Sequence, residues 1–175
     1  MFLTHRLSWL RRFGLMMSVA GALITSPSTA QTSDPNQLRA AIVFNVLRFV
    51  EFPIEQGRTI EFCVAADAPE NAALRSLSGR RAGARPVLVR TIRGGSYGGC
   101  DVVFLSSADR DQIERASGRG RLLIGNGRSF IDNGGAVGLV QSGGQVRFQL
   151  NLRAASQSKV VISSRLIRLA SKVTR

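Results

Sequence analysis

The stretch from residue 39 to residue 53 reads RAAIVFNVLRFVEFP, and it decides how the chain folds. Aliphatic and aromatic side chains occupy most positions around a helical repeat of 3.6 residues. Asp34 can cap the start of the predicted helix, and Pro53 ends it. A helix this apolar must be buried on more than one side, so other elements have to pack around it. The polar residues of this region fall on one narrow stripe of the helix: Gln37, Asn45, Arg48 and Glu51.

This polar stripe allows two interpretations. Asn45 and Arg48 either face water on a core helix, or they face a partner or a ligand. Periodicity alone favours the core helix. An asparagine on such an apolar helix is expected to satisfy a neighbouring backbone group rather than a partner.

The N-terminal region has the pattern of a secretory signal. Residues 1–12 are basic and contain no acid, and residues 13–24 form an apolar run. Small residues follow at 28–30, where a signal peptidase would read them. The run is too short for a comfortable transmembrane helix, which needs about 20 apolar residues. We therefore predict a cleaved signal over residues 1–30 and a single exported domain over residues 31–175.

Removal of this signal would also remove the only histidine, His5, and the only tryptophan, Trp9. A domain without histidine cannot use Ser-His-Asp or Cys-His catalysis, or bind a metal through imidazole. Asp67, Asp101 and Asp132 supply carboxylates, but no motif places two of them together. We therefore expect no catalytic residues, no metal site and no cofactor.

The chain is strongly basic, with a formal net charge of +13. Without the three arginines of the predicted signal, about +10 remains. Such a balance can indicate nucleic acid or an anionic membrane as a partner. The arginines are scattered, however, which favours a solvated basic surface. An exported protein also rarely meets nucleic acid, so we predict no nucleic-acid partner.

Two cysteines remain in the exported part, Cys63 and Cys100. An even pair in an oxidising compartment predicts a disulfide. Two separately buried thiols are the alternative. A redox-active pair is disfavoured because the chain has no CxxC spacing.

Strand and helix patterns alternate along the middle of the chain, which predicts a parallel sheet with helical crossovers. Glu70 follows Asp67 at the spacing of a capping box, so these two are expected to start the first crossover helix. If the third strand lies beside the first, Cys63 and Cys100 come within bridging reach. Strands are predicted over residues 59–67, 85–91, 100–105 and 121–124, and helices over about 69–78 and 108–116.

The last third of the chain changes character. Residues 136–140 and 145–150 flank Ser142-Gly143-Gly144, which predicts an antiparallel hairpin. A last helix is expected to start at Ser163 or Ser164 and to include Val173. The predicted fold is a single α/β domain: a mixed, mostly parallel sheet flanked by helices, as in a Rossmann-like sandwich, with a C-terminal antiparallel hairpin.

Open α/β sheets bind ligands at the carboxyl ends of their strands. Asp67, Ser106 and the turn Gly125–Gly127 follow three predicted strands. A module that binds a small ligand at this edge is therefore one hypothesis for the function.

Four stretches, in order and at fitting spacing, resemble the YfiR family of periplasmic regulators over about residues 37–173. They are AAIVFNVLRFVEFP with Asn45, Phe49 and Pro53; IEFCVAAD with Cys63; CDVVFLS with Cys100; and VRFQLNLRAA with ISSRLIRLASKV, which contain Asn151, Ser163 and Ser164.

The resemblance implies a non-catalytic periplasmic protein that binds the periplasmic domain of an inner-membrane diguanylate cyclase or related sensor. Restraint of the cyclase would lower cyclic-di-GMP output and biofilm formation. The resemblance also implies a homodimer and a structural disulfide between Cys63 and Cys100. The residues expected at the partner- or ligand-binding site are Asn45, Arg48, Phe49, Asn151, Ser163 and Ser164.

Overall fold

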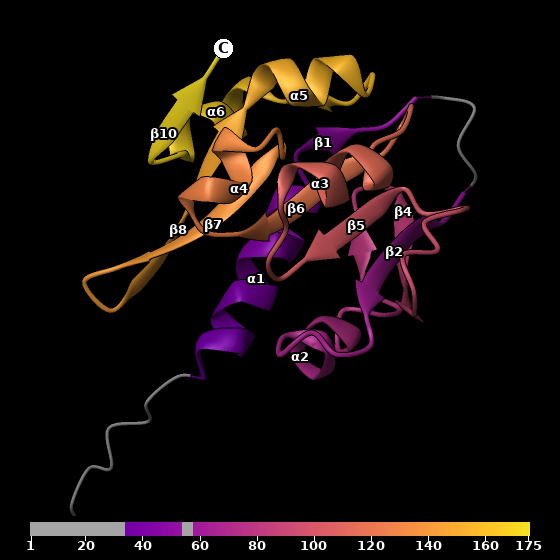
Figure 1. Cartoon of the computed structure of the whole chain (residues 1–175). Helices are drawn as coiled ribbons and strands as arrows, with labels where there is room; N and C mark the ends of the chain where they lie inside the picture. Colours follow the sequence, from indigo (N-terminus) through magenta and orange to yellow (C-terminus); the bar gives the residue numbers. More distant parts are fainter. Residues whose placement is uncertain (1–33, 54–57) are drawn as a thin grey trace, which may run out of the picture. The chain divides into compact units, whose positions relative to one another are not determined.

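The computed structural model describes residues 34–53 and 58–175, so the predicted signal lies outside the described residues. The described part forms a single α/β domain (Figure 1). Its helices are α1 (Pro35–Leu47), α2 (Asn71–Arg75), α3 (Arg110–Ala116), α4 (Arg128–Asp132), α5 (Leu152–Gln157) and α6 (Ser164–Leu169). Its strands are β1 (Val50–Glu51), β2 (Ile60–Ala65), β3 (Arg81–Ala82), β4 (Arg85–Ile92), β5 (Val102–Leu105), β6 (Leu122–Asn126), β7 (Val137–Ser142), β8 (Gln145–Asn151), β9 (Val161–Ile162) and β10 (Lys172–Thr174).

The main sheet has eight strands in the order β10-β8-β7-β6-β5-β2-β4-β3. Neighbours from β4 to β7 run parallel, and β7 and β8 form the predicted antiparallel hairpin. β10 then returns parallel to β8 at the edge of the sheet. The sheet is therefore mixed and mostly parallel, as the sequence predicts.

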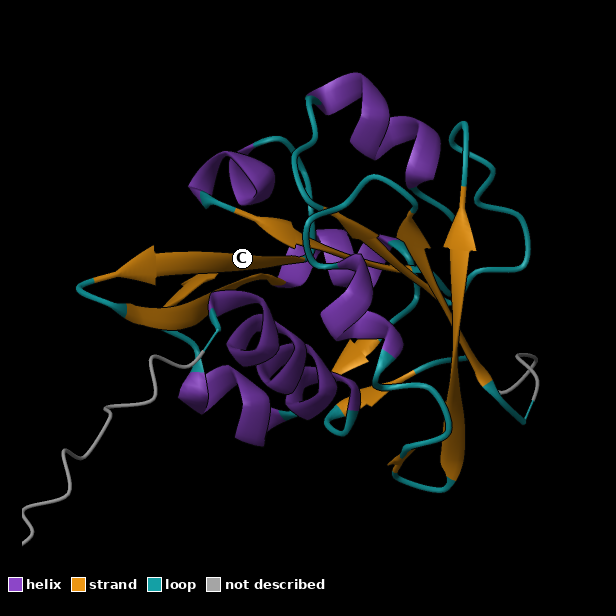
Figure 2. Cartoon of the chain, turned by 90° about the horizontal axis from the view of Figure 1, so that it is seen from below, coloured by secondary structure: helices purple, strands orange, loops and turns teal. Residues whose placement is uncertain are grey.

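Helices cover both faces of this sheet (Figure 2). On one face, α1 and α2 pack against the larger apolar cluster, which includes Phe62, Phe104 and Ile124. On the other face, α3 and α4 pack against a smaller cluster around the disulfide. The nearly continuous apolar runs of the central strands follow from this burial on both sides.

The first helix is shorter than predicted. α1 ends at Leu47, and the chain then forms β1, which pairs with β9 in a separate two-stranded sheet. Val50 faces Ile162 in this pairing. The expected end at Pro53 is wrong because a long-range strand pairing replaces the last helical turn. The apolar pattern still marks burial, since Val43, Val46 and Leu47 are almost fully enclosed.

Two further boundaries differ from the prediction. α2 starts after Glu70 without a side-chain cap, so the capping box with Asp67 does not form. The last helix ends at Leu169, and Val173 lies in β10 instead, opposite Leu150 of β8. Here, too, pairing with a distant strand decides the local structure.

β5 lies beside β2, and this adjacency places Cys63 opposite Val103. The cysteine that precedes β5 then reaches its partner, and Cys63 and Cys100 form a disulfide with their Cα atoms 5.8 Å apart. The pairing implied by the sequence is confirmed.

Candidate partner-binding site

An apolar groove of about 320 Å³ lies where the end of α1 meets α6. Its floor combines side chains from three distant parts of the chain. Ile42 and Val46 come from α1, Phe148 comes from β8, and Leu166 comes from α6. Leu169 closes one side and is 63% exposed, which makes it the most exposed large apolar side chain in the described residues.

Asn45 supplies the polar group of this groove. It lies on the exposed side of α1, between Phe44 and Val46, which are both buried. Its amide forms no hydrogen bond with any residue that the structure describes. A structural role in which Asn45 satisfies a neighbouring backbone group is therefore not observed, and the amide is available to a partner.

Phe49 connects the groove to the short sheet of β1 and β9. Its ring lines the groove, and its carbonyl accepts a hydrogen bond from the Ser163 amide at 3.0 Å. The guanidinium groups of Arg48 and Arg165 lie 5.9 and 5.8 Å from the ring centroid, within the range of a cation–π contact. The groove thus combines an apolar floor with a cationic rim.

The structure brings most of the residues expected at the site to this region. Asn45 and Phe49 line the groove, and Arg48 borders it. Ser163 caps α6, because its hydroxyl accepts a hydrogen bond from the Leu166 amide at 3.3 Å, and Ser164 is the exposed first residue of that helix. The motif residues around Ser163 therefore position α6 against α1.

Asn151 lies apart from the groove. Its side chain caps α5 by accepting a hydrogen bond from the Ala154 amide at 3.1 Å, and it donates to the Ile131 carbonyl at 3.5 Å. None of these residues lines the groove. The geometry of Asn151 is that of a helix cap.

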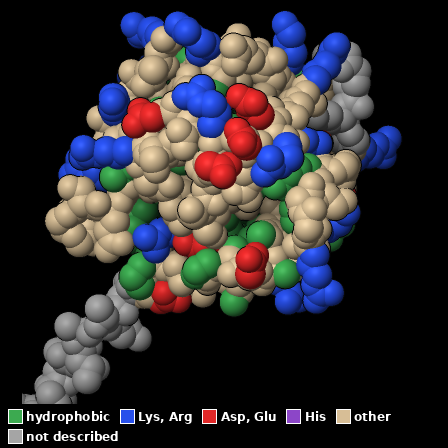
Figure 3. Space-filling model, viewed as in Figure 1, with side chains coloured by type: hydrophobic (Ala, Val, Ile, Leu, Met, Phe, Trp, Pro, Cys, Tyr) green, Lys and Arg blue, Asp and Glu red, His purple; other side chains and the backbone are tan. Residues whose placement is uncertain are grey.

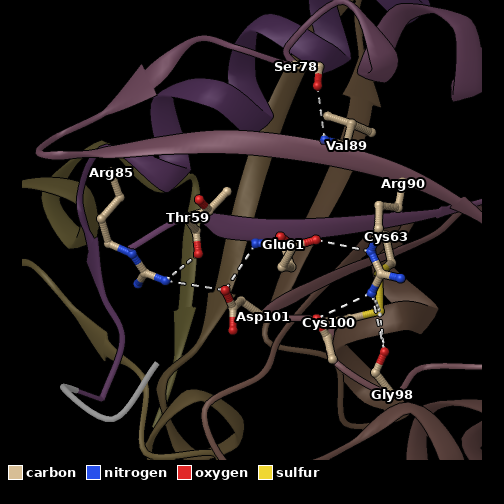
Figure 4. A network of polar contacts seen from close by, with 11 residues as sticks. Thr59, Glu61, Cys63, Ser78, Arg85, Val89, Arg90, Gly98, Cys100 and Asp101 are labelled. Carbon is tan, nitrogen blue, oxygen red and sulfur yellow. Dashed lines mark hydrogen bonds and ion pairs between the residues drawn. A yellow bond between two sulfur atoms is a disulfide. The ribbon is translucent and has the colours of Figure 1, made fainter. Parts of the chain in front are cut away.

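The disulfide is enclosed in a polar network near the start of β5, away from the groove (Figure 4). Arg90 lies beside both sulfur atoms, with its Nη2 3.7 Å from Cys63 and 3.8 Å from Cys100, and its Nε pairs with Glu61 at 3.0 Å. Asp101 accepts a hydrogen bond from the Glu61 amide at 3.0 Å and pairs with Arg85 at 3.3 Å.

Arg121 ties the chain on either side of Cys100 to α3. Its guanidinium donates to the carbonyls of Tyr97, Cys100 and Ala116. Burial lowers the pKa of Arg121, and the charge of Asp101 partly opposes that effect. These contacts support the cystine.

The edge formed by the carboxyl ends of the strands does not assemble as one ligand site. Ser106 and Asn126 both donate to the carboxylate of Glu70, at 2.7 Å each. The Gly127 amide donates to the Leu139 carbonyl at 2.8 Å, so it is not free to bind an anion. The Gly125–Gly127 segment therefore serves packing and strand pairing.

Glu70 does not have the role in a capping box that its spacing from Asp67 predicts. It is only 3% exposed and joins α2 to the ends of β5 and β6. A glutamate three residues after an exposed Asp67 fits a capping box equally well. Only the tertiary position of α2 distinguishes the two roles.

Asp67 lines a separate pocket of about 390 Å³ at the ends of β2, β4 and β5. Arg93, Tyr97 and Gln112 also line it. Neither Asp67 nor Arg93 forms an ion pair with a described residue. In the part of the chain that the structure describes, no three His, Cys, Asp or Glu residues gather to hold a metal.

A family model described as YfiR/HmsC-like matches residues 36–171. No curated protein matches the chain. Two solved structures are similar to part of this chain. One is described as a conserved domain protein from Vibrio cholerae O1 biovar El Tor, with 13% identity and a TM-score of 0.53 over 80% of this chain. The other is described as the ABC domain in complex with L-Trp from Streptococcus pneumonia, with 7% identity and a TM-score of 0.48 over 79% of this chain. The chain spans 60% of the length of each.

Proposed function

Because the chain belongs to the YfiR/HmsC-like family, we propose that it restrains a membrane-bound diguanylate cyclase, or a related sensor protein, by binding that protein's periplasmic domain. Membership of the family supports a periplasmic regulator of diguanylate cyclase signalling rather than a catalyst. The finer assignment, direct contact through a defined surface, rests on the groove between α1 and α6.

One observation carries this assignment. The family's motif residues Asn45 and Phe49 line an apolar groove whose polar amide has no partner among the described residues. Exposed apolar surface bordered by arginine is typical of protein interfaces, where aromatic residues and Arg are enriched. We expect an apolar side chain of the partner to enter the groove, and an acceptor on the partner to meet Asn45 or Arg48.

Complementation of a deletion strain tests the proposal. Deletion should raise cellular cyclic-di-GMP, and the wild-type gene should lower it again. Leu169→Asp should fail to do so, because it places a charge in the groove without removing buried packing. Leu88→Asp on β4 is the matched control, since Leu88 is also exposed, at 44%, but lies outside the groove.

Two outcomes would count against the proposal. An unchanged cyclic-di-GMP level in the deletion strain would contradict the regulatory function. Equal behaviour of the two variants, with both proteins folded, would contradict the groove as the contact surface.

Two further parts of the proposal concern export and assembly. We expect cleavage of residues 1–30 and a homodimer in the periplasm. Intact mass and light scattering of protein from the periplasmic fraction would measure both.

A second candidate function is small-ligand binding in the pocket that Asp67 and Arg93 line. The observation that favours it is that an exposed carboxylate, Asp67, and an exposed guanidinium, Arg93, line one cavity. The cavity lies at the end of β2, whose neighbours in the sheet are β4 on one side and β5 on the other. Ligands of open α/β sheets often bind at such a point. Thermal-shift screening with anionic metabolites tests it. Binding should be lost in Arg93→Ala, and the absence of any shift in the wild-type protein would contradict it.

A further inference from the structure

Asp132 is the last acidic residue of the chain. The residues after it contain seven lysines and arginines and no carboxylate side chain. They build β7, β8, α5, β9, α6 and β10, which lie next to one another at one end of the domain. Residues 31–132 carry 14 lysines and arginines against 11 acids, so most of the excess of cations lies in this last part of the chain. We call the exposed part of residues 145–175 the C-terminal surface.

Contacts within this surface show that its cations adjoin one another. Arg153 at the start of α5 donates to the carbonyl of Arg175 beside β10. Arg147 and Lys172 line one polar hollow of about 680 Å³ on the outer face of β8, together with Arg128, and none of its described lining residues is acidic. In the view of Figure 3, lysines and arginines lie along the upper border and also at the sides and lower right, and most acidic side chains lie nearer the centre and the lower edge.

Two large aliphatic side chains project from the same surface. Val161 on β9 is 59% exposed, and Leu169 at the end of α6 is 63% exposed. Arg168 precedes Leu169 in the chain, and Lys159 lines a hollow together with Val161. Glu51 of β1 faces Val161 across the strand pair, so this surface carries an excess of cations and is not free of acids. Exposed aliphatic groups among an excess of cations are the combination with which peripheral proteins bind an anionic bilayer.

We propose that the C-terminal surface docks on anionic phospholipid headgroups. An acidic protein partner would need carboxylates that match individual arginines, whereas a bilayer requires only a continuous cationic surface and apolar tips. Each cation near the membrane raises the partition coefficient about fivefold. Val161 and Leu169 enter the headgroup region, and the attraction weakens as salt screens it.

This surface adjoins the groove between α1 and α6, because Leu169 belongs to both. Docking would therefore hold the groove close to the bilayer that anchors the proposed partner. The membrane contact does not depend on that partner, so failure of one proposal leaves the other testable.

Co-sedimentation of protein from the periplasmic fraction with vesicles tests the inference. The protein should bind vesicles that contain phosphatidylglycerol and phosphatidylcholine, should not bind phosphatidylcholine alone, and should dissociate at high salt. Reversal of three cations of the surface, Arg153→Glu, Arg168→Glu and Lys172→Glu, should lower the partition coefficient by at least about tenfold.

A matched triple variant separates this surface from net charge alone. Arg75→Glu, Arg110→Glu and Arg115→Glu change the net charge equally, but they lie on α2 and α3, outside the C-terminal surface, and α3 also carries Asp111 and Glu114. This variant should lose much less binding. Circular dichroism checks that both variants fold.

Three results would overturn the inference. They are no binding of wild type to anionic vesicles at low salt, equal losses in the two triple variants, and binding of the C-terminal surface to an acidic protein domain but not to vesicles.

Discussion

Single positions differ in how far their roles can be inferred from sequence. Cys63 and Cys100 could be paired in advance, because an exported chain with two cysteines has one possible disulfide. Glu70 could not be placed, because its partners Ser106 and Asn126 are 36 and 56 residues away. Asn45 lies between these cases. Its exposed position follows from helical periodicity, but its place in a groove depends on α6.

Replacement of both cysteines by alanine should lower the free energy of unfolding by about 2–5 kcal/mol. The bridge spans 37 residues in sequence, and closing such a loop restricts the unfolded chain by an amount worth roughly 4 kcal/mol. Urea unfolding with and without reductant measures the effect. Wild type in reductant should approach the variant, and identical midpoints in all cases would show that the bridge contributes nothing.

Glu70→Ala should lower the free energy of unfolding by about 2–3 kcal/mol, because it leaves the Ser106 hydroxyl and the Asn126 amide without their acceptor. Glu70→Gln should cost about 1 kcal/mol or less. Its amide oxygen can still accept from the Asn126 amide, and its NH₂ group can donate to the Ser106 hydroxyl oxygen. Thermal unfolding of both variants measures the difference. Equal losses would contradict the hydrogen-bonding explanation.

Among the helices and strands, the sequence pattern predicted those that do not depend on pairing with a strand far away in the chain. The hairpin of β7 and β8, the helix α3 and the central parallel strands were predictable, since their apolar periods and turn residues act locally. β1, β9 and β10 were not, because each exists only through pairing with a strand far away in sequence. The groove was missed for the same reason: it requires α1, β8 and α6 together.

The anchoring of α4 offers a test at this scale. The ring of Phe130 lies between Gly125 and Gly135, and a Cβ atom added at either glycine would overlap that ring. Gly135→Ala should therefore destabilise the domain by about 1–3 kcal/mol. A second substitution, Phe130→Leu, should recover part of the loss when combined with it.

Gly98→Ala is the matched control, because no atom lies within 4 Å of its added Cβ and its backbone is not left-handed. Chemical unfolding of the wild type, the single variants Gly135→Ala and Phe130→Leu, and the double variant measures the coupling. Strict additivity of the two substitutions would show that the ring does not clash with the new methyl group.

The whole molecule combines a well-enclosed core with an unbalanced charge. In the described part of the chain, no helix is long and apolar enough to cross a membrane. The net charge could be read from composition, but its segregation could not. It depends on the sheet order, which places β10 and β8 together at one edge.

This segregation predicts that salt stabilises the protein. The cations of the C-terminal surface repel one another in the folded state, and salt screens such repulsion between exposed groups. Raising sodium chloride from low to moderate concentration should therefore increase the melting temperature by about 3 °C, which corresponds to roughly 1 kcal/mol for a domain of this size. The triple variant Arg153→Glu, Arg168→Glu and Lys172→Glu should respond less, since it replaces repulsion with attraction. A melting temperature that is flat or falls with salt in the wild type, or an equal rise in the variant, would show that the segregated charge does not strain the fold.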